Sequence, residues 1–389
     1  MNRISQLEKK YVNEVLNNQF KTSKNNIYNN KLESAFSKKI NMPYSISHVN
    51  GTATMHTALA ALGVKEGDEV IVPPLTMSST SLAVLQNNSV PIFADVDINT
   101  FNIDPQSIIN LINKKTKAII TVALYGLSPE YNEILKICKE HNLFLIEDNA
   151  ETFLSKYKGK YVGEFGDFSS FSFQASKHLT CGEGGILSAK NVDFADNARR
   201  FSSLGYGSID AKKGKISKSD IQDPEYKRHV SFGFNYRMSE LCAAVSLAQL
   251  ERSDELTNIR IKSAEYFLDS ISDSDLLIPQ FTPSYSINTY WSLALVLNVK
   301  NPKDWYRFRA LFNKNKGDGY YAAWALTYFE PFFRNSVQAK KAIWQDYKTG
   351  LCPNAEYLQP RLIQLKTNYW NLDQAEEQAE ILRKTIKQF

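Results

Sequence analysis

Residues 118–150 read AIITVALYGLSPEYNEILKICKEHNLFLIEDNA, and this stretch decides the fold. The apolar run from Ala118 to Val122 predicts a buried strand, Glu130 to His141 has the periodicity of a helix, and Leu143 to Ile146 predicts a second strand. A strand, a helix and a strand in this order are typical of a parallel sheet, because parallel strands need a crossover connection.

The same alternation extends in both directions from this stretch. Toward the N-terminus the pattern predicts, in order, the helix Thr52–Leu62, the strand Glu69–Val72, the helix Met77–Gln86, the strand Pro91–Ala94 and the helix Pro105–Asn113. Toward the C-terminus, the aromatic run Phe168–Phe173 and the apolar run Ile186–Ser188 predict two strands that enclose a glycine-rich turn. We therefore expect an α/β fold with a mostly parallel sheet flanked by helices.

The length of the chain predicts two domains. A chain of 389 residues exceeds the size at which a single core stops growing. After the expected helix Met238–Leu250 the charge density rises and strands become fewer, with Trp291–Leu297 the clearest. We predict a large domain over residues 1–252 and a smaller α+β domain over residues 253–389. Residues 205–230, rich in Gly, Lys, Ser and Asp, are expected to form a long loop.

Composition disfavours several classes of protein. The net charge is only +5, and the densest basic run, Lys212 to Lys218, is better explained as a solvated loop than as a nucleic-acid site. The four cysteines form no Cys-x-x-Cys pair, so we expect neither a metal site nor a disulfide framework, and a reducing cytoplasmic location. No run of 18 apolar residues and no signal-peptide pattern occurs, so neither membrane spanning nor secretion is expected.

Three short motifs carry chemistry. The strand Leu143–Ile146 ends in Glu147 and Asp148, at the sheet edge where open α/β folds bind ligands, although a loop acid or a helix cap would look the same. Lys177 lies between a strand and the turn Gly182–Gly185, where partial burial would make it a nucleophile toward an aldehyde; surface lysines are far commoner.

The third motif is the helix start Gly51-Thr52-Ala53. The free N–H groups of a helix N-terminus bind phosphate, although a simple cap at Thr52 explains the motif equally well. Together the three motifs require one ligand with a phosphate, a ring nitrogen that pairs with a carboxylate, and an aldehyde. Pyridoxal phosphate has all three.

The chain also resembles the DegT/DnrJ family of sugar-nucleotide aminotransferases, which have the fold-type-I architecture. The matching stretches are Gly51–Ala53, Gly67–Pro73, Phe93–Asp97, Asn102–Asp104, Thr116–Ile119, Glu147–Asp148, Gly182–Gly185, Phe234–Met238 and Ala248–Arg252. The likeness covers about residues 30 to 255, with a fainter match at Cys352–Glu356.

The resemblance implies a role for individual residues. Lys177 would form the Schiff base with the cofactor, Asp148 would pair with the pyridinium nitrogen, and Thr52, Ala53 and Ser172 would hold the phosphate. Asn235 resembles an asparagine that reaches the cofactor phosphate of the neighbouring subunit, which implies a homodimer with shared active sites. Ser172 could also be a simple strand hydroxyl, and Asn235 a turn residue.

Two positions depart from the family pattern. Met77 stands where the family usually has an aromatic residue over the cofactor ring, so the contact there would be softer. Glu151 stands where glutamine or histidine is common, and its carboxylate would oppose a negatively charged cofactor oxygen unless it is protonated or paired.

The resemblance implies transfer of an amino group from an amino acid, expected to be glutamate, to the ketone of a nucleotide-linked sugar, most readily a 4-keto-6-deoxy sugar for surface polysaccharide. A dehydratase of the same family has histidine in place of the lysine, so Lys177 favours transfer. A cyclitol or other ketone as acceptor, and a regulatory protein with a dead site, stay open as alternatives. Residues that could meet the substrate are His229, Arg237, Tyr320, Tyr321 and Trp324, although a core or dimer-interface role is favoured for the three aromatic residues and a structural ion pair stays open for Arg237.

Overall fold

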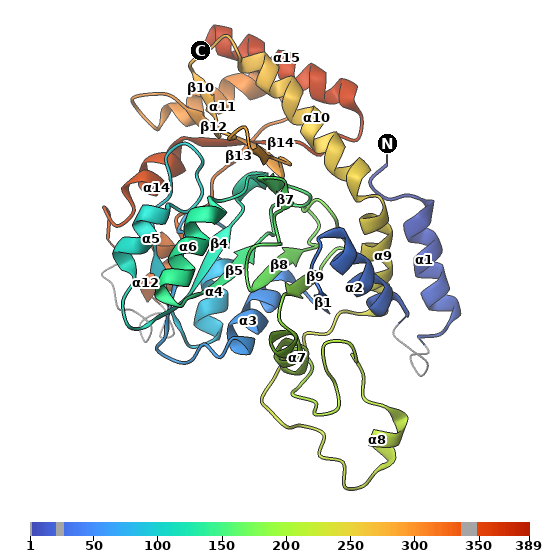
Figure 1. The fold of residues 1–389 in the computed structure, drawn as a ribbon. Helices are drawn as coiled ribbons and strands as arrows, with labels where there is room; N and C mark the ends of the chain where they lie inside the picture. Colours follow the sequence, from blue (N-terminus) through green and yellow to red (C-terminus); the bar gives the residue numbers. More distant parts are fainter. Residues whose placement is uncertain (1, 21–26, 336–347) are drawn as a thin grey trace.

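The computed structural model describes residues 2–20, 27–335 and 348–389. Its main layer is a seven-stranded sheet in the order β1-β9-β8-β5-β4-β2-β3, with helices on both faces (Figure 1). The strands of this sheet are β1 (Tyr44–His48), β2 (Glu69–Val72), β3 (Val90–Phe93), β4 (Thr116–Val122), β5 (Phe144–Asp148), β8 (Phe168–Ser172) and β9 (Gly185–Ala189). Only β9 among them runs against the others, because it pairs antiparallel with β8 and with β1.

The expected fold class is confirmed. Each helix and strand that the sequence predicted lies within about two residues of its predicted bounds. The helices of this layer are α3 (Gly51–Ala61), α4 (Ser79–Gln86), α5 (Pro105–Leu111), α6 (Tyr131–His141) and α7 (Val192–Phe201). Strands β2, β4 and β5 are buried along nearly their whole length, as expected of parallel strands that helices cover on both faces. The carboxyl ends of β4, β5 and β8 consequently meet at one edge of the sheet.

The edge strand β1 was not predicted from the sequence. Its sequence, YSISH, contains Ser45, Ser47 and His48, yet all three side chains are buried. Each finds a partner: Ser45 bonds the Ser188 hydroxyl at 2.8 Å, Ser47 donates to Glu33, and His48 bonds Thr57 at 3.1 Å. These partners come from distant parts of the chain, so hydropathy alone does not reveal the strand.

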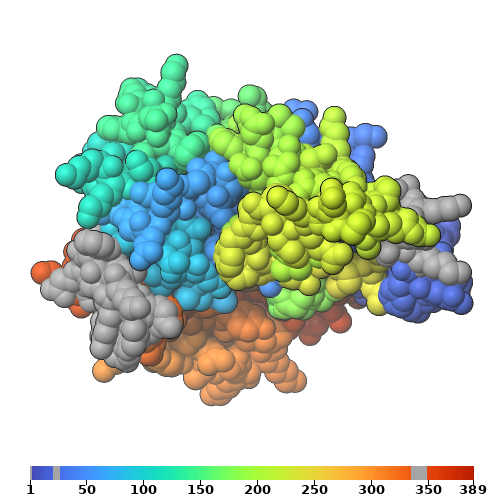
Figure 2. Space-filling model, turned by 90° about the horizontal axis from the view of Figure 1, so that it is seen from below, coloured from blue at the N-terminus to red at the C-terminus, as the bar shows by residue number. Residues whose placement is uncertain are grey.

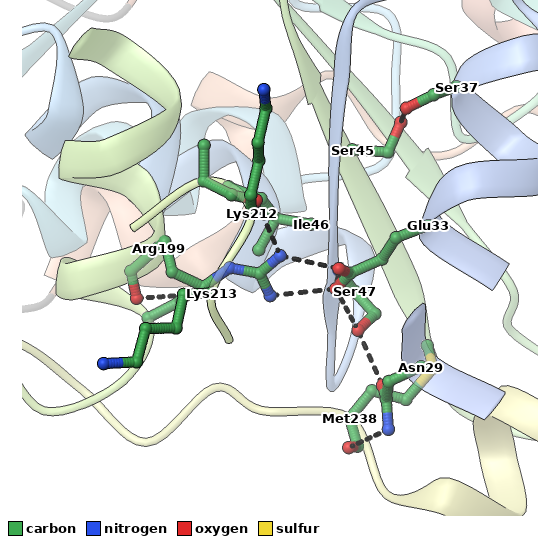
Figure 3. A network of polar contacts seen from close by, with 12 residues as sticks. Asn29, Glu33, Ser37, Ser45, Ile46, Ser47, Arg199, Lys212, Lys213 and Met238 are labelled. Carbon is green, nitrogen blue, oxygen red and sulfur yellow. Dashed lines mark hydrogen bonds and ion pairs between the residues drawn. The ribbon is translucent and has the colours of Figure 1, made fainter. Parts of the chain in front are cut away.

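A buried ion pair fixes β1 to its surroundings (Figure 3). Arg199 of α7 donates to both carboxylate oxygens of Glu33, at 2.9 and 2.6 Å, and Glu33 lies on α2 (Ile27–Lys39). The same carboxylate accepts from the backbone N–H of Ser47, and Arg199 also donates to the carbonyl of Ala211. The pair therefore ties two helices, the edge strand and the start of the following loop together.

The smaller layer follows a break between two helices. Helix α9 (Glu240–Glu251) packs against α2 and α1 (Gln6–Asn17), and α10 (Ser253–Ile271) begins two residues later. A four-stranded antiparallel sheet lies beyond it, in the order β10-β12-β14-β13. Its strands and covering helices are β10 (Leu277–Pro279), β12 (Ser292–Leu297), β13 (Tyr321–Ala322), β14 (Leu362–Lys366), α11 (Asp304–Lys314) and α15 (Leu372–Gln388).

The chain after Arg252 does not stay within this smaller layer. The segment η2 (Thr327–Phe329), α12 (Pro331–Asn335) and α14 (Pro353–Leu358) returns to the large sheet, where Tyr328 packs edge-on against Phe93. The short strand β11 (Ser286–Ile287) pairs with β6 (Lys156–Tyr157), whose hairpin partner is β7 (Lys160–Tyr161). The division at residues 252 and 253 stays a prediction.

Residues 205–233 form an arm that stands away from the sheet. Figure 1 shows the arm, with α8 (Lys218–Gln222), below α7, and Figure 2 shows it in yellow-green as a ridge on that face of the molecule. Phe232 on this arm is 78% exposed. None of the helices in the described part of the chain is both long and apolar enough to cross a membrane.

The ion pair between Glu33 and Arg199 gives a test of this architecture. In Arg199→Met, Glu33 stays buried without its cation, so we expect a loss of about 3–5 kcal/mol in the free energy of unfolding. Urea denaturation measures the loss. The control Lys39→Met removes the exposed pair with Asp254 and should cost less than about 1 kcal/mol. Equal losses in the two variants would contradict a structural role of the buried pair.

Candidate active site

A cavity of about 900 Å³ lies between the carboxyl edge of the large sheet and the small layer. Its wall on the large-sheet side includes residues at the ends of three neighbouring strands, namely Val122, Asp148 and Ser172. Further wall residues are Asn50, Gly51, Thr52, Thr76, Met77, Glu151, Lys177, Glu183, Arg260, Trp291, Tyr321, Trp324, Gln364, Lys366 and Asn368. The cavity thus contains all three motifs that the sequence singled out.

The phosphate motif depends on two glycines, Gly185 and Gly51, each of which lies close to a neighbouring segment of the chain. Asn50, and not Thr52, caps α3, and its side chain accepts from the N–H of Ala53 at 2.8 Å. The N–H groups of Gly51 and Thr52 belong to the first turn, where a helix supplies no acceptor. A Cβ on Gly185 would lie 2.6 Å from the carbonyl carbon of Asn50, so only glycine allows β9 to approach.

Ser172 completes this corner of the cavity. A Cβ on Gly51 would lie 3.1 Å from the Cβ of Ser172, so the hydroxyl at the end of β8 stands beside the start of α3. Backbone N–H groups, a hydroxyl and the positive end of a helix are the donors that a phosphate monoester needs. Ala53 is buried and its N–H is already bonded to Asn50, so it contributes to this corner through the cap.

The carboxylate of Asp148 lies at the end of β5 and is only 4% exposed. It accepts from the hydroxyl of Thr80 at 2.8 Å and from the N–H of Ala150 at 3.2 Å. Burial raises the pKa of Asp148, against the hydrogen bonds from Thr80 and Ala150 and the charge of Lys177, which lower it. A buried acid of this kind gains most from a cationic partner, and a protonated ring nitrogen would be one.

The neighbouring acid Glu147 has a different role. Its side chain points to the opposite face of β5, as alternation along a strand requires. It accepts from the N–H groups of Gly163, Phe165 and Gly166 at 2.8, 2.8 and 2.6 Å. Glu147 therefore holds the loop that follows β7, and Asp148 lines the cavity.

Glu151 and Lys177 face each other inside the cavity. The Nζ of Lys177 lies 3.9 Å from Oε1 of Glu151 and 4.5 Å from the centre of the Trp291 ring. Glu151 is 2% exposed and its Oε2 accepts from the N–H of Tyr125 at 3.1 Å. Burial raises the pKa of Glu151 to about 7, although Lys177 lowers it in part. Near neutral pH this acid is therefore partly protonated and able to donate.

The opposite wall is aromatic and basic. The indole rings of Trp291 and Trp324 stack, with their centres 5.8 Å apart, and Tyr321 beside them is 69% exposed. Lys366 at the end of β14 also reaches the cavity, where it pairs with Asp318. Met77 lies across the cavity at the start of α4 and is 49% exposed, so its side chain is free to contact a ligand.

Five expected site residues do not line the cavity of this chain, namely Ala53, which is described above, and four others. Tyr320 is buried in the core of the small layer, where its hydroxyl donates to the carbonyl of Trp305. His229, Asn235 and Arg237 lie on or beside the arm: His229 bridges Tyr206, Asn235 bridges Ser203, and the Arg237 guanidinium lies over the Tyr206 ring. These three face a second, smaller hollow or open solvent instead.

Sequence reasoning missed several residues of the cavity. Thr80 supports Asp148, and Arg260, Trp291 and Lys366 come from the small layer. A signal for Arg260 was present, because it lies on the apolar stripe of α10 that also contains Leu256 and Phe267, where a charged residue is unusual. Nothing comparable marks Thr80, whose contact depends on how α4 packs against β5.

This set of side chains fits pyridoxal phosphate. Gly51, Thr52 and Ser172 offer donors to its phosphate, Asp148 offers a buried carboxylate to its ring nitrogen, and Lys177 offers an amine to its aldehyde. The two glycine contacts let the start of α3 lie close to Ser172 and to β9, where a Cβ on either glycine would meet protein atoms. The fold and the cavity together define a pyridoxal-phosphate enzyme of fold type I.

Comparison with known proteins identifies the family. The model of the DegT/DnrJ/EryC1/StrS aminotransferase family matches residues 2–384, and the chain belongs to this family. It is a pyridoxal-phosphate-dependent aminotransferase.

A curated relative, GDP-perosamine synthase of Escherichia coli, is 37% identical over 298 residues, which are 76% of this chain and 77% of the relative. Two solved structures at 25% identity are also similar. GDP-4-keto-6-deoxymannose-3-dehydratase with bound GDP-perosamine has a TM-score of 0.83, over 97% of this chain and 98% of that one. The E. coli GDP-4-keto-6-deoxy-D-mannose-3-dehydratase with bound hydrated PLP has a TM-score of 0.84, over 99% and 98%.

Gly185→Ala tests the phosphate corner. The added methyl would lie 2.6 Å from the carbonyl carbon of Asn50 and 2.9 Å from the nitrogen of Gly51, so the start of α3 must move. We expect the Kd for pyridoxal phosphate to rise by roughly tenfold or more, about 1.4 kcal/mol. The control Gly214→Ala adds a methyl that meets only the Arg199 side chain at 3.5 Å. Absorbance titration measures both, and unchanged affinity in Gly185→Ala would refute the assignment of this corner.

Glu151→Gln tests the buried acid in the cofactor-free protein. Burial raises the pKa of Glu151 from 4.5 to about 7, so between these values the folded chain holds a proton that the unfolded chain has lost. Stability must therefore fall as the pH rises through this window, by up to about 3 kcal/mol for this group. In Glu151→Gln that part of the fall should vanish.

Urea denaturation at about pH 5 and about pH 8 measures the difference. The control Glu140→Gln removes the same charge from the exposed outer face of α6 and should leave the fall unchanged. If Glu151→Gln keeps the full pH dependence of the wild-type protein, the side chain is not a protonated acid in the folded state.

Proposed function

We propose that this enzyme transfers an amino group from glutamate to the C4 ketone of a nucleotide-linked 4-keto-6-deoxy sugar. The observation that carries the proposal is that Lys177, Asp148 and the start of α3 all line one cavity. GDP-4-keto-6-deoxymannose is the first candidate substrate, because a relative is named GDP-perosamine synthase and a similar structure binds GDP-perosamine. The product would be the corresponding 4-amino sugar, for a surface polysaccharide.

The residues of the cavity would divide the work as follows. Pyridoxal phosphate, when bound, supplies an aldehyde and a ring that accepts the electron pair released at the donor carbon. Thr52, Gly51 and Ser172 hold its phosphate, and Met77 lies beside its ring. Lys177 would hold the aldehyde at rest, and its freed amine would move a proton from the α-carbon of the donor to the former aldehyde carbon, and later from that carbon to C4 of the sugar.

Two acids would control the charge around the ring. Asp148, buried and supported by Thr80, keeps the ring nitrogen protonated, which favours withdrawal of electrons into the ring. Glu151 lies on the other side of Lys177 and, when protonated, donates to the ring oxygen beside the aldehyde. A glutamate here, in place of the common glutamine or histidine, would repel the negatively charged ring oxygen if it were ionised. Protonation of Glu151 removes this repulsion.

The opposite wall would bind the sugar nucleotide. Stacked Trp291 and Trp324, together with Tyr321, offer apolar faces to a sugar ring or a base, and Lys366 offers a positive charge to a diphosphate. Because Tyr320 lies in the core, we propose that it supports this wall from behind and makes no direct contact with substrate.

We further propose a homodimer with shared active sites. Asn235, His229 and Arg237 do not line the cavity of their own chain, and they stand on or beside the protruding arm. An arm of this shape, with an exposed Phe232, would reach the cavity of a second copy, where Asn235 meets the cofactor phosphate and His229 and Arg237 meet substrate.

The four free cysteines agree with a cytoplasmic location.

A dehydratase is the second candidate, since two similar structures are dehydratases. The presence of Lys177 favours transfer, because an amine that can return a proton to the substrate is what transamination requires. A cyclitol or another ketone as the acceptor is not favoured by any residue of the cavity.

Incubation with glutamate and GDP-4-keto-6-deoxymannose tests the proposal. We expect nuclear magnetic resonance of the product to show an amine at C4 and equal formation of 2-oxoglutarate. Lys177→Ala should abolish both, whereas Lys366→Ala, which removes the other lysine of the cavity wall, should retain amino transfer with weaker sugar binding. A product that has lost the C3 hydroxyl and gained no amine would establish the dehydratase instead.

A further inference from the structure

The turn that carries Lys177 is held by its backbone carbonyls. Two amide oxygens of this turn, those of Ser176 and Lys177, each accept from more than one side chain. Trp291 donates its indole N–H to Ser176 at 2.9 Å, and Arg260 donates to Ser176 at 3.1 Å and to Lys177 at 3.2 Å. Arg3, from the N-terminal segment, donates to Lys177 at 2.8 Å. Charged donors bind such carbonyls more firmly than neutral ones.

Arg260 is the unusual member of this group. Its guanidinium is 1% exposed, and no carboxylate of the described ranges lies within ion-pair distance of it. Burial, together with the smaller effect of the charge of Arg3, lowers the pKa of Arg260 to about 9. A buried cation without a carboxylate is costly, so its carbonyl contacts must offset that cost.

Arg260 also joins the two layers of the molecule. Its Nη1 donates to the carbonyl of Trp291 at 2.8 Å and to the hydroxyl of Thr367 at 3.2 Å, both in the small layer. Its Nη2 donates to the lysine turn in the large layer. One rigid, planar group thus fixes the distance between the start of β12 and the backbone of Lys177.

We propose that Arg260 is a positioning residue for Lys177, which holds the lysine turn against the small layer so that the amine stays aligned in the cavity. The proposal rests on the proposed role of Lys177 as the residue that bonds the cofactor. Because a small misplacement of a reacting group is costly, loss of this clamp slows the chemistry more than it weakens binding.

The test uses the holoenzyme and three variants. Arg260→Gln keeps a hydrogen-bond donor but loses the guanidinium group that bonds both layers at once, and Arg260→Lys keeps the positive charge. Thr367→Val removes the hydroxyl that accepts a hydrogen bond from Arg260, while Arg260 itself stays in place. The first readout is kcat against KM for the amino donor, from the spectral change of the cofactor. The second readout is the visible circular dichroism of the bound cofactor per unit of absorbance, which reports how the lysine holds it.

We expect Arg260→Gln to lower kcat by roughly tenfold to a hundredfold with a smaller change in KM, and to reduce the visible circular dichroism. Arg260→Lys should recover part of both, and Thr367→Val should show a weaker effect of the same kind. The control Arg199→Lys alters a buried arginine that does not line the cavity, so it should lower stability and leave both readouts unchanged.

Two results would overturn the proposal. The first is an unchanged kcat and an unchanged circular dichroism in Arg260→Gln. The second is a fall of kcat and circular dichroism in Arg199→Lys that is as large, for the same loss of stability, as the fall in Arg260→Gln. If Arg260→Gln does not fold, Thr367→Val decides between the same outcomes. Failure of the proposed function would look different, because the wild-type holoenzyme would then show no lysine-bound cofactor band at all.

Discussion

The buried carboxylate of Asp148 is the constraint on which the rest of the site depends. An acid at the end of a parallel strand, 4% exposed, loses most of its hydration, and the hydroxyl of Thr80 and the N–H of Ala150 replace only part of it. Burial therefore raises its pKa and leaves a place where a cationic ring nitrogen is strongly favoured. We propose that the ring nitrogen of the cofactor pairs with Asp148 and so completes an interaction that the folded chain leaves unfinished.

Two further features fit the cavity around that acid. The contact of Gly185 with Asn50 brings β9, the one reversed strand of the large sheet, close to α3, and the helix start lies beside Ser172, where we propose that the phosphate binds. The small layer then closes the other side through Trp291 and Arg260, which bond the backbone of the lysine turn. The cavity is thus a joint product of both layers.

The parts of this structure that follow from local pattern were predictable. Strands β2, β4 and β5 each contain a short apolar run, and Asp148, Lys177 and Gly51 lie beside predicted strand or helix ends, so their meeting at one sheet edge follows from the parallel topology. Strand β1 was not predictable, because its buried serines are satisfied by Glu33 and Ser188 from elsewhere. Thr80 was missed for the same reason, because its partner is set by tertiary packing, whereas Arg260 was missed although its place on the apolar stripe of α10 marks it as unusual.

The central claim is that Lys177 is the residue that bonds pyridoxal phosphate. Reduction of the holoenzyme with borohydride, followed by proteolysis and peptide mass mapping, tests it directly, because the reduced bond survives digestion. The account predicts that the cofactor label lies on Lys177 and is absent from Lys366, the other lysine that lines the cavity. A label on Lys366, or an enzyme whose bound cofactor is not trapped on any lysine, would contradict it.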